Sequence, residues 1–286
     1  MPAVTAEEIA RVIDAALAED IGPGDVTCAY FVDPAQQGVA RIVAREPGVA
    51  AGVDVAKEVF LRVDPSLEVA SGKLDGSLLV PGDVLLTVRG PVRSLLTAER
   101  VALNFLQRLS GIATLTRRFV DLVAETPARI LDTRKTTPGL RALEKAAVVA
   151  GGGVNHRFGL YDMVMVKDNH LAAADDLDFL QTAIRRVKAE RPGIRVELEA
   201  DTLEQVRGFL TLDGVDVILL DNMSLEEMAQ AVQLGKQKKV AFEASGGVTL
   251  ERVAAIARTG VHFISIGALT HSARALDLSL ELEKQA

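Results

Sequence analysis

Apolar and polar residues alternate at helical spacing at the start of this chain. The stretch 5–19 places an apolar residue every three or four positions, which predicts an amphipathic helix. Thr5 stands at the N-cap position and Glu8 follows three residues later, as in a capping box. The next stretch, 20–27, contains glycine and proline and predicts a loop.

From residue 31 to about 93 the pattern changes to short apolar or alternating runs. These runs predict strands at 39–44, 48–52 and 84–88, with one helix at 54–62 between them. Proline and glycine turns separate the runs. The pattern therefore predicts an α+β segment with a mostly antiparallel sheet.

Residues 97–123 form a long predicted helix with two distinct faces. Its core stripe consists of Val101, Phe105, Ile112, Leu115 and Phe119. A second face carries Arg100, Asn104, Gln107 and Gly111. That face is either solvated or in close contact with another backbone or another subunit.

After residue 130 the chain repeats an apolar strand, a polar strand end and an amphipathic helix. Such repetition predicts parallel strands with crossover helices. The strand ends are Arg134-Lys135, Lys167-Asp168, Glu197–Glu199, Asp221-Asn222, Ser245-Gly246 and Gly267. The predicted helices cover 140–149, 176–190, 202–209, 225–234, 250–259 and 272–283. Polar residues at the carboxyl ends favour a (β/α) barrel over a doubly wound sheet. Only six strands are evident, so either two lie before residue 130 or the barrel is short.

Cations gather at two of these strand ends. The stretch 130–137, ILDTRKTT, ends one strand, and 163–170 ends another, with Asn155-His156-Arg157 between them. Burying such charges requires a partner of opposite sign, so the cluster favours a pocket for a small anionic molecule. The alternative is a set of surface ion pairs with Asp132 and Asp168.

Glycines end the last two strands. Ser245-Gly246-Gly247 opens a helix, and Gly267-Ala268 ends the next strand. Exposed backbone N–H groups at such turns bind phosphate, although two glycines can also serve only a tight turn.

Three carboxylates lie between the cationic and glycine-rich ends. Glu197 and Glu199 alternate with apolar residues and share one strand face, and Asp221 ends the following strand. Carboxylates opposite a phosphate site suit Mg²⁺. Ion pairing with Lys135 or Lys167 is the competing interpretation.

The composition narrows the function classes. A net charge of −7 and a pI near 5.3 argue against non-specific nucleic-acid binding, although positive charge is locally concentrated in 130–170. No apolar run approaches a membrane span, the N-terminal stretch is too acidic for a signal peptide, and a single Cys28 suits a reducing cytosol. We therefore expect a cytoplasmic protein without nucleic-acid or membrane partners. His156, His170, His262 and His271 lack the spacing of a zinc site.

The stretch 131–171, LDTRKTTPGLRALEKAAVVAGGGVNHRFGLYDMVMVKDNHL, resembles the signature of the quinolinate phosphoribosyltransferases (nicotinate-nucleotide pyrophosphorylases, carboxylating). EDIGPGDVT, TAERVALNFLQRLSGIAT, VELE, ILLDN and FEASGGV are similar to the same family in the same order. The resemblance covers about residues 5–280. DTRKTTPG together with HR and VKDNH is a specific combination.

The resemblance implies an α/β fold, with an irregular (β/α) barrel of fewer than eight strands and an N-terminal α+β open-sandwich domain. The expected domains are 1–112 and 113–271, with a C-terminal helix at 272–286 packed on the first. The implied reaction, in NAD biosynthesis, joins quinolinate to phosphoribosyl pyrophosphate (PRPP) with Mg²⁺ and releases pyrophosphate and CO₂. The resemblance also implies a homodimer in which Arg100 reaches the partner's site.

The resemblance assigns roles residue by residue. The quinolinate residues are Arg100, Thr133, Arg134, Lys135, His156, Arg157 and Lys167. The PRPP residues are Lys135, Lys167, Glu197, Asp221, Ser245, Gly246, Gly247, Gly267, Ala268 and Leu269. The catalytic group comprises Lys135, Lys167, Glu197 and Asp221. Glu197 and Asp221 are expected to hold either Mg²⁺ or the ribose hydroxyls, with Glu199 as an alternative second carboxylate. Guanidinium groups suit the two carboxylates of quinolinate, whereas lysines suit phosphate oxygens. Alternatives are a phosphoribosyltransferase for another heteroaromatic acid and a non-catalytic phosphosugar-binding barrel.

Overall fold

The structure, a computed structural model, describes residues 5–167, 170 and 176–284. Its contacts form two compact units. Unit 1 comprises Met1–Arg117, Thr136–Gly152 and Ala268–Ala286, and unit 2 comprises Arg118–Lys135 and Gly153–Gly267. This division falls between residues 117 and 118, whereas the expected boundary lay at residue 112; both positions are inside one long helix.

Unit 1 begins with the predicted capped helix. Helix α1 (Ala6–Ile21) has the Thr5–Glu8 capping box, with each partner bonding the other's backbone. The predicted loop that follows is shorter than expected, because Asp25 caps a second helix, α2 (Val26–Phe31). The Asp25 carboxylate accepts the Cys28 N–H at 2.9 Å.

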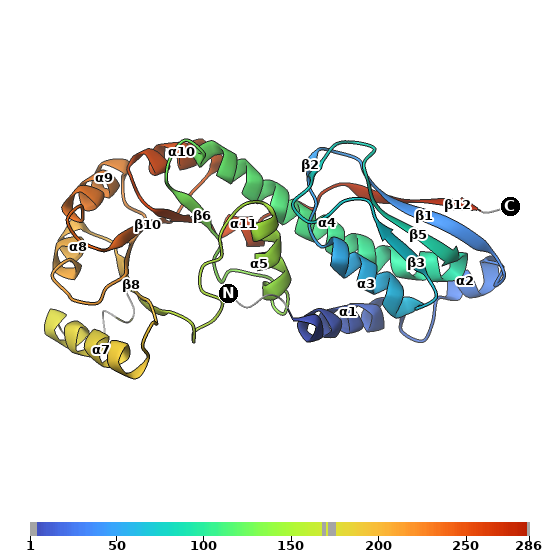
Figure 1. Ribbon diagram of the computed structural model, residues 1–286, viewed down its shortest axis with the longest axis horizontal. Coiled ribbons are helices and arrows are strands. Elements are labelled where there is room, and N and C mark those ends of the chain that lie inside the picture. The colour runs from blue at the N-terminus through green and yellow to red at the C-terminus, as the bar shows by residue number, and fades with distance from the viewer. Residues whose placement is uncertain (1–4, 168–169, 171–175, 285–286) are drawn as a thin grey trace. The chain divides into compact units, whose positions relative to one another are not determined.

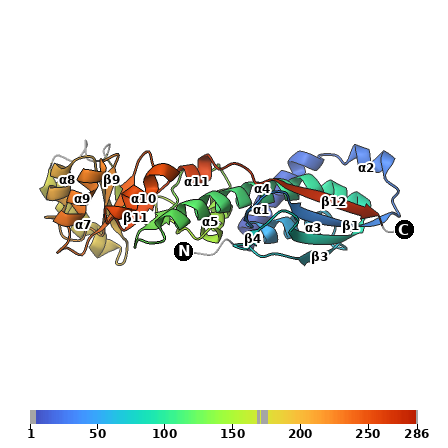
Figure 2. The same cartoon turned by 90° about the horizontal axis from the view of Figure 1, so that it is seen from above.

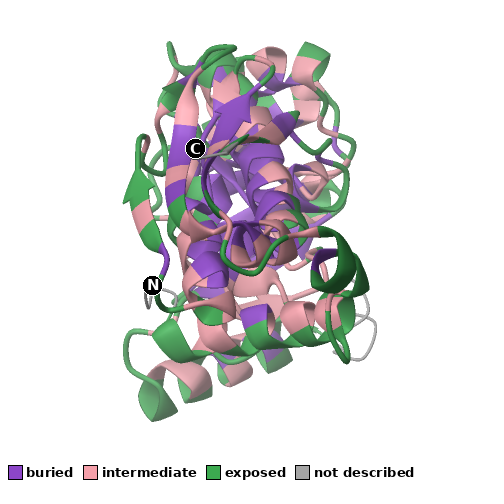
Figure 3. Ribbon diagram, turned by 90° about the vertical axis from the view of Figure 1, so that its right-hand side faces the viewer, coloured by how far each residue is buried: buried purple, intermediate pink, exposed green. Residues whose placement is uncertain are grey.

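The main sheet of unit 1 has the strand order β12-β1-β5-β3, and all its pairs are antiparallel. Its strands are β1 (Gln37–Ala44), β3 (Glu68–Ser71), β5 (Val84–Pro91) and β12 (Leu278–Lys284). The short strands β2 (Gly48–Val49) and β4 (Leu78–Leu79) pair separately. Buried residues follow one another along β1, so this strand is covered on both faces. Figure 3 shows the buried segments of the chain in purple among intermediate and exposed ones. The α+β prediction for this region is confirmed.

The predicted C-terminal helix is wrong. Residues 278–284 form β12, which lies beside β1 (Figure 2). In LSLELEK the leucines occupy every second position, which is the period of a strand. Arg41 of β1 and Arg45, the residue after the end of β1, form ion pairs with Glu283 and Glu281 of β12.

Helix α4 (Val92–Val123) fits closely against the C-terminal segment along its polar face. Gln107 Nε2 donates to the Leu278 carbonyl at 2.8 Å. A Cβ atom on Gly111 would overlap the carbonyl oxygen of Arg274, so this helical glycine permits the contact. Arg100 and Asn104, on the same face, are exposed. The remaining helices of unit 1 are α3 (Val53–Val63), α5 (Arg141–Ala150) and α11 (Ala268–His271).

Unit 2 contains a six-stranded parallel sheet with the order β6-β11-β10-β9-β8-β7. Its strands are β6 (Arg129–Leu131), β7 (Val164–Val166), β8 (Val196–Ala200), β9 (Val217–Asp221), β10 (Ala241–Ser245) and β11 (Phe263–Ser265). Because β6, the earliest strand, pairs with β11, the latest, the order is that of a ring opened between β6 and β7. The predicted barrel of fewer than eight strands is confirmed.

The crossover helices lie outside this curved sheet (Figure 1). They are α7 (Leu177–Glu190), α8 (Leu203–Phe209), α9 (Leu225–Leu234) and α10 (Leu250–Arg258). Their bounds agree with the predicted helices to within one residue, apart from N-cap positions. No helix in the described part of the chain is long and apolar enough to cross a membrane.

Candidate active site

The first strand of unit 2 ends in a buried carboxylate. Asp132, which follows β6, has no exposed surface, and its Oδ1 accepts the backbone N–H of His156 at 2.8 Å. Asp132 therefore fixes the segment that carries His156 and Arg157. The interpretation of Asp132 as a surface ion-pair partner is wrong. Asp168, the other acid in that interpretation, lies outside the described residues.

One guanidinium group of unit 2 lies near enough to another to act on it electrostatically. Burial lowers the pKa of Arg157, and the positive charge of Arg134 lowers it further. Both side chains are of intermediate exposure. A pair of like charges held close together and half-buried favours binding of an anion with two negative groups.

The predicted lysine at the end of β7 has a carboxylate partner. Lys167 Nζ forms an ion pair with Glu199 on the neighbouring strand β8. Glu199 is buried, whereas Lys167 is partly exposed. This contact is an ion pair of the kind that the competing interpretation of the carboxylates predicts.

The strand register separates Glu197 from Asp221. Glu197 pairs with Val217, and Asp221 lies four residues further along β9, about 13 Å in the strand direction. Glu199 pairs with Leu219, only about 7 Å from Asp221 and on the same face. The predicted sharing of one Mg²⁺ by Glu197 and Asp221 therefore does not match this geometry, whereas Glu199 and Asp221 lie close enough to act together.

Glu197 instead faces the interior, together with Glu243, a residue that the sequence analysis did not single out. His156 Nε2 lies 3.2 Å from Glu197 Oε2 and 3.3 Å from Oε2 of Glu243, which is buried on β10. The acids line a cavity of about 130 Å³ that also touches Arg129 and Arg195, near the amino ends of the strands. The signal for Glu243 was a single acid on the inward face of an otherwise apolar strand.

The three side chains also bring possible metal ligands within 4.8 Å of one another. However, the Arg157 backbone N–H donates to His156 Nδ1 at 2.7 Å, so the ring proton belongs on Nε2, facing the two carboxylates. A protonated Nε2 is not a metal ligand. Burial lowers the pKa of His156, but the neighbouring carboxylates of Glu197 and Glu243 raise it to about 9. The hydrogen bond accepted by Nδ1 nevertheless assigns the neutral ring here, with its one proton on Nε2. Burial and the nearby Glu243 raise the pKa of Glu197.

These contacts also bear on the predicted hydrogen bond from His156 to quinolinate. Both ring nitrogens are engaged within the protein, and His156 is 7% exposed. A direct bond to a ligand would require one of these contacts to be given up. The geometry favours His156 as a support for Arg157.

The predicted phosphate turn has the required backbone shape. Gly246 and Gly247 have φ angles of +90° and +55°, after β10 and before α10. A Cβ atom on Gly246 would overlap the Asn222 side chain. The Asn222 backbone N–H donates to the Ser245 carbonyl at 3.0 Å, which joins this turn to the end of β9.

The remaining predicted site residues divide between the units. Thr133, Lys135 and Gly267 belong to unit 2, and the Thr133 hydroxyl accepts the Lys135 N–H at 3.1 Å. Ala268 and Leu269 belong to α11 in unit 1. Arg100 lies exposed on α4 of unit 1, and its side chain has no ion pair or hydrogen bond with any described residue.

Comparison with known proteins identifies the family. Residues 25–110 match the model "Quinolinate phosphoribosyl transferase, N-terminal domain", and residues 112–281 match the C-terminal domain of the same family.

Individual relatives agree over nearly the whole chain. The probable nicotinate-nucleotide pyrophosphorylase [carboxylating] of Bacillus subtilis is 44% identical over 92% of this chain and 90% of its own length. A mitochondrial quinolinate phosphoribosyltransferase [decarboxylating] of Nicotiana glauca is 43% identical over 99% and 85%. The crystal structure of NadC from Streptococcus pyogenes covers both chains fully, with a TM-score of 0.92 and 40% identity. This chain belongs to the quinolinate phosphoribosyl transferase family.

Proposed function

We propose that the protein joins quinolinate to PRPP to give nicotinate mononucleotide, pyrophosphate and CO₂, a reaction of NAD biosynthesis. The observation that carries this proposal is the adjacent pair Arg134 and Arg157, placed in the same unit as a glycine turn suited to phosphate. The arginine pair suits the two carboxylates of quinolinate, and the glycine turn suits the phosphate of a phosphosugar.

At the quinolinate end, two planar guanidinium groups can each donate two hydrogen bonds to a carboxylate. The half-buried position of Arg134 and Arg157 excludes part of the competing water. A bound dianion would also relieve the repulsion between the two cations. Thr133 and His156 support this end by fixing the local backbone.

At the PRPP end, Lys135 and Lys167 supply positive charge for phosphate oxygens, and the Ser245–Gly247 turn supplies backbone donors with Gly267, Ala268 and Leu269. Glu199 and Asp221 are the carboxylates we assign to Mg²⁺ or the ribose hydroxyls, because they share one strand face near the carboxyl ends. When bound there, Mg²⁺ neutralises charge on the pyrophosphate group.

The first chemical step is attack of the quinolinate nitrogen on the anomeric carbon of the ribose. The C–O bond to pyrophosphate breaks as the new C–N bond forms, and positive charge develops on the ribose. Glu199 and Asp221 stabilise that charge, while Lys135 and Lys167 stabilise the departing pyrophosphate. Fixed charges and orientation supply the acceleration, and no covalent enzyme intermediate is needed.

The second step removes the carboxylate next to the ring nitrogen. The bond between the ring carbon and this carboxylate breaks, and CO₂ leaves while the electron pair stays on the ring carbon. The neighbouring positive nitrogen stabilises that carbanion, which then takes a proton from water. Release of the negative carboxylate weakens binding to the guanidinium pair and favours product departure.

We further propose that the protein is a cytoplasmic homodimer. The exposed Arg100 is a cation without a side-chain partner among the described residues, beside a polar helix face. In the dimer, Arg100 of each chain would reach the quinolinate site of the partner chain and bind a carboxylate there.

The proposal is tested by following pyrophosphate release with PRPP and Mg²⁺ present. Release with quinolinate and none with nicotinate is the expected result. Pyrophosphate release with nicotinate but not with quinolinate would show that nicotinate, and not quinolinate, is the substrate. Tight PRPP binding without turnover of either acid would favour a non-catalytic phosphosugar-binding barrel.

A further inference from the structure

A charged hub in unit 1 joins helices α4 and α5. Glu144 has no exposed surface, and its Oε1 lies 2.9 Å from Arg108 Nη2 and 3.2 Å from Arg108 Nε. The Arg108 side chain is only partly exposed, so removing it would leave the buried Glu144 carboxylate without its compensating charge. The pair is therefore a firm attachment point for whatever else it contacts.

On one side the hub holds the loop that follows the cationic strand end. Glu144 Oε2 accepts the Thr137 backbone N–H at 3.1 Å, and Oε1 accepts the Thr137 hydroxyl at 2.8 Å. Thr137 comes two residues after Lys135 in the chain. Both donors of one residue are thus bound by one carboxylate, which fixes this end of the loop.

On the other side the hub holds helix α11 and the segment after it. Arg108 Nη2 donates to the Thr270 carbonyl, and Nη1 donates to the Ala273 carbonyl at 3.2 Å. Helix α11 begins with Ala268 and Leu269. A lysine could not replace this arrangement, because only the planar guanidinium reaches the carboxylate and both carbonyls together.

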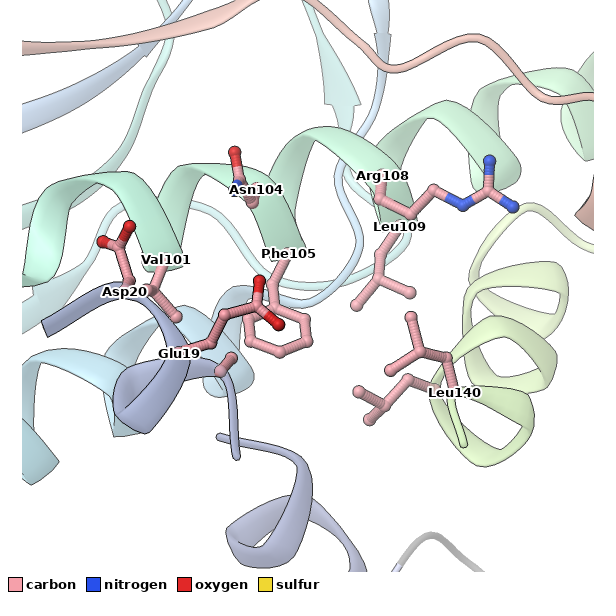
Figure 4. A pocket seen from close by; sticks show the side chains of 10 residues that line it. Glu19, Asp20, Val101, Asn104, Phe105, Arg108, Leu109 and Leu140 are labelled. Carbon is pink, nitrogen blue, oxygen red and sulfur yellow. The ribbon is translucent and has the colours of Figure 1, made fainter. Parts of the chain in front are cut away.

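Arg108 also borders a cavity of about 170 Å³ between α1, α4 and α5. In Figure 4 the side chains of Phe105, Leu109 and Leu140 line the hollow, and the guanidinium end of Arg108 extends beyond them. The guanidinium group of Arg108 bonds to Glu144 and to the two backbone carbonyls and points away from the cavity.

We propose that Arg108 and Glu144 are positioning residues for substrate binding, which fix the loop after Lys135 and the helix that begins with Ala268. This inference rests on the proposed function only in naming what the two segments bind. The anchoring itself follows from contacts within unit 1.

The test compares Glu144→Gln with a matched control, Asp83→Asn. Asp83 also pairs with a cation, Lys73 at 2.9 Å, and accepts a backbone N–H, from Val80 at 3.0 Å. It lies in unit 1 on a loop without proposed substrate residues. A gentler variant, Thr137→Val, removes only the Thr137 hydroxyl, which donates to Glu144 and accepts from Arg108 at 3.5 Å. It serves if Glu144→Gln does not fold.

Two readouts are measured well below each variant's unfolding temperature. Amide hydrogen exchange should become faster in residues 136–140 and 268–274 for Glu144→Gln, and remain unchanged there for Asp83→Asn. The KM values for quinolinate and PRPP should rise about tenfold in Glu144→Gln, the typical loss for a charged hydrogen bond. Thr137→Val should show smaller changes in the same direction.

A lower unfolding temperature with unchanged exchange and unchanged KM values would overturn the proposal, since that is the behaviour of a purely structural ion pair. The exchange readout needs no substrate. If the wild-type protein turned over neither acid, the proposed function would fail, while the exchange result would still support or reject the anchoring.

Discussion

At the residue scale, the account depends on two guanidinium groups placed close together. Burial and mutual repulsion both disfavour the charged form of Arg157, and this cost is offset when a dianion binds. Affinity for quinolinate is then set by the guanidinium pair, whereas PRPP binds through other groups.

Arg134→Ala should therefore weaken quinolinate binding about tenfold to a hundredfold, the range for losing a charged hydrogen bond, and change PRPP binding far less. Calorimetric titration with each ligand measures both affinities. Arg186→Ala is a suitable control, because Arg186 is largely exposed and, among the residues that the structure describes, forms an ion pair only with Glu190 on its own helix. An equal loss of affinity for both ligands would reject the assignment of Arg134.

The carboxylates show where residue-level prediction reached its limit. The alternation in VELEA placed Glu197 and Glu199 on one strand face, but it gave no depth along the barrel. That depth comes from pairing with β9, which puts Glu197 beside Val217 and leaves Glu199 closer to Asp221. The role of Glu243 was not predicted for the same reason, since it depends on contacts between segments that are distant in sequence.

At the element scale, local sequence patterns predicted most helices and strands correctly. Capping residues such as Thr5 and the 3.6-residue period of the barrel helices are local signals. The prediction for the C-terminal segment failed because the short run LSLELEK is compatible with both a helix and a strand. Its pairing with β1, more than 230 residues away in the chain, decides the outcome.

The helix α4 offers a test of this packing. Helix propensity alone predicts that Gly111→Ala would stabilise the protein by about 0.5–1 kcal/mol. We predict destabilisation by about 1–3 kcal/mol instead, because the new Cβ would overlap the backbone carbonyl of Arg274. Urea unfolding measures the difference.

Gly208→Ala in α8 is the control for this change. A Cβ atom there would meet only the flexible Leu177 side chain at 3.3 Å, so stability should stay the same or rise slightly. If Gly111→Ala stabilised the protein as Gly208→Ala does, the close contact between α4 and the C-terminal segment would be contradicted.

At the scale of the whole molecule, the proposed homodimer makes a quantitative prediction. Arg100→Ala and Arg134→Ala should each be nearly inactive alone. In a random mixture, half the dimers contain one chain of each kind, and one site in each such dimer has both arginines. Activity should therefore recover to about a quarter of wild type.

The mixture is assayed after the dimers have exchanged chains, and the separate variants at the same total concentration are the control. If Arg100 served the site of its own chain, no mixed dimer would contain an intact site. Absence of recovery would then exclude the shared site.

The most direct test of the whole account follows the carboxylate that is lost. Quinolinate labelled in the carboxylate next to the ring nitrogen should release one labelled CO₂ for each pyrophosphate, and label in the other carboxylate should stay in the nucleotide. Pyrophosphate release without labelled CO₂ from the first compound would contradict the proposed reaction.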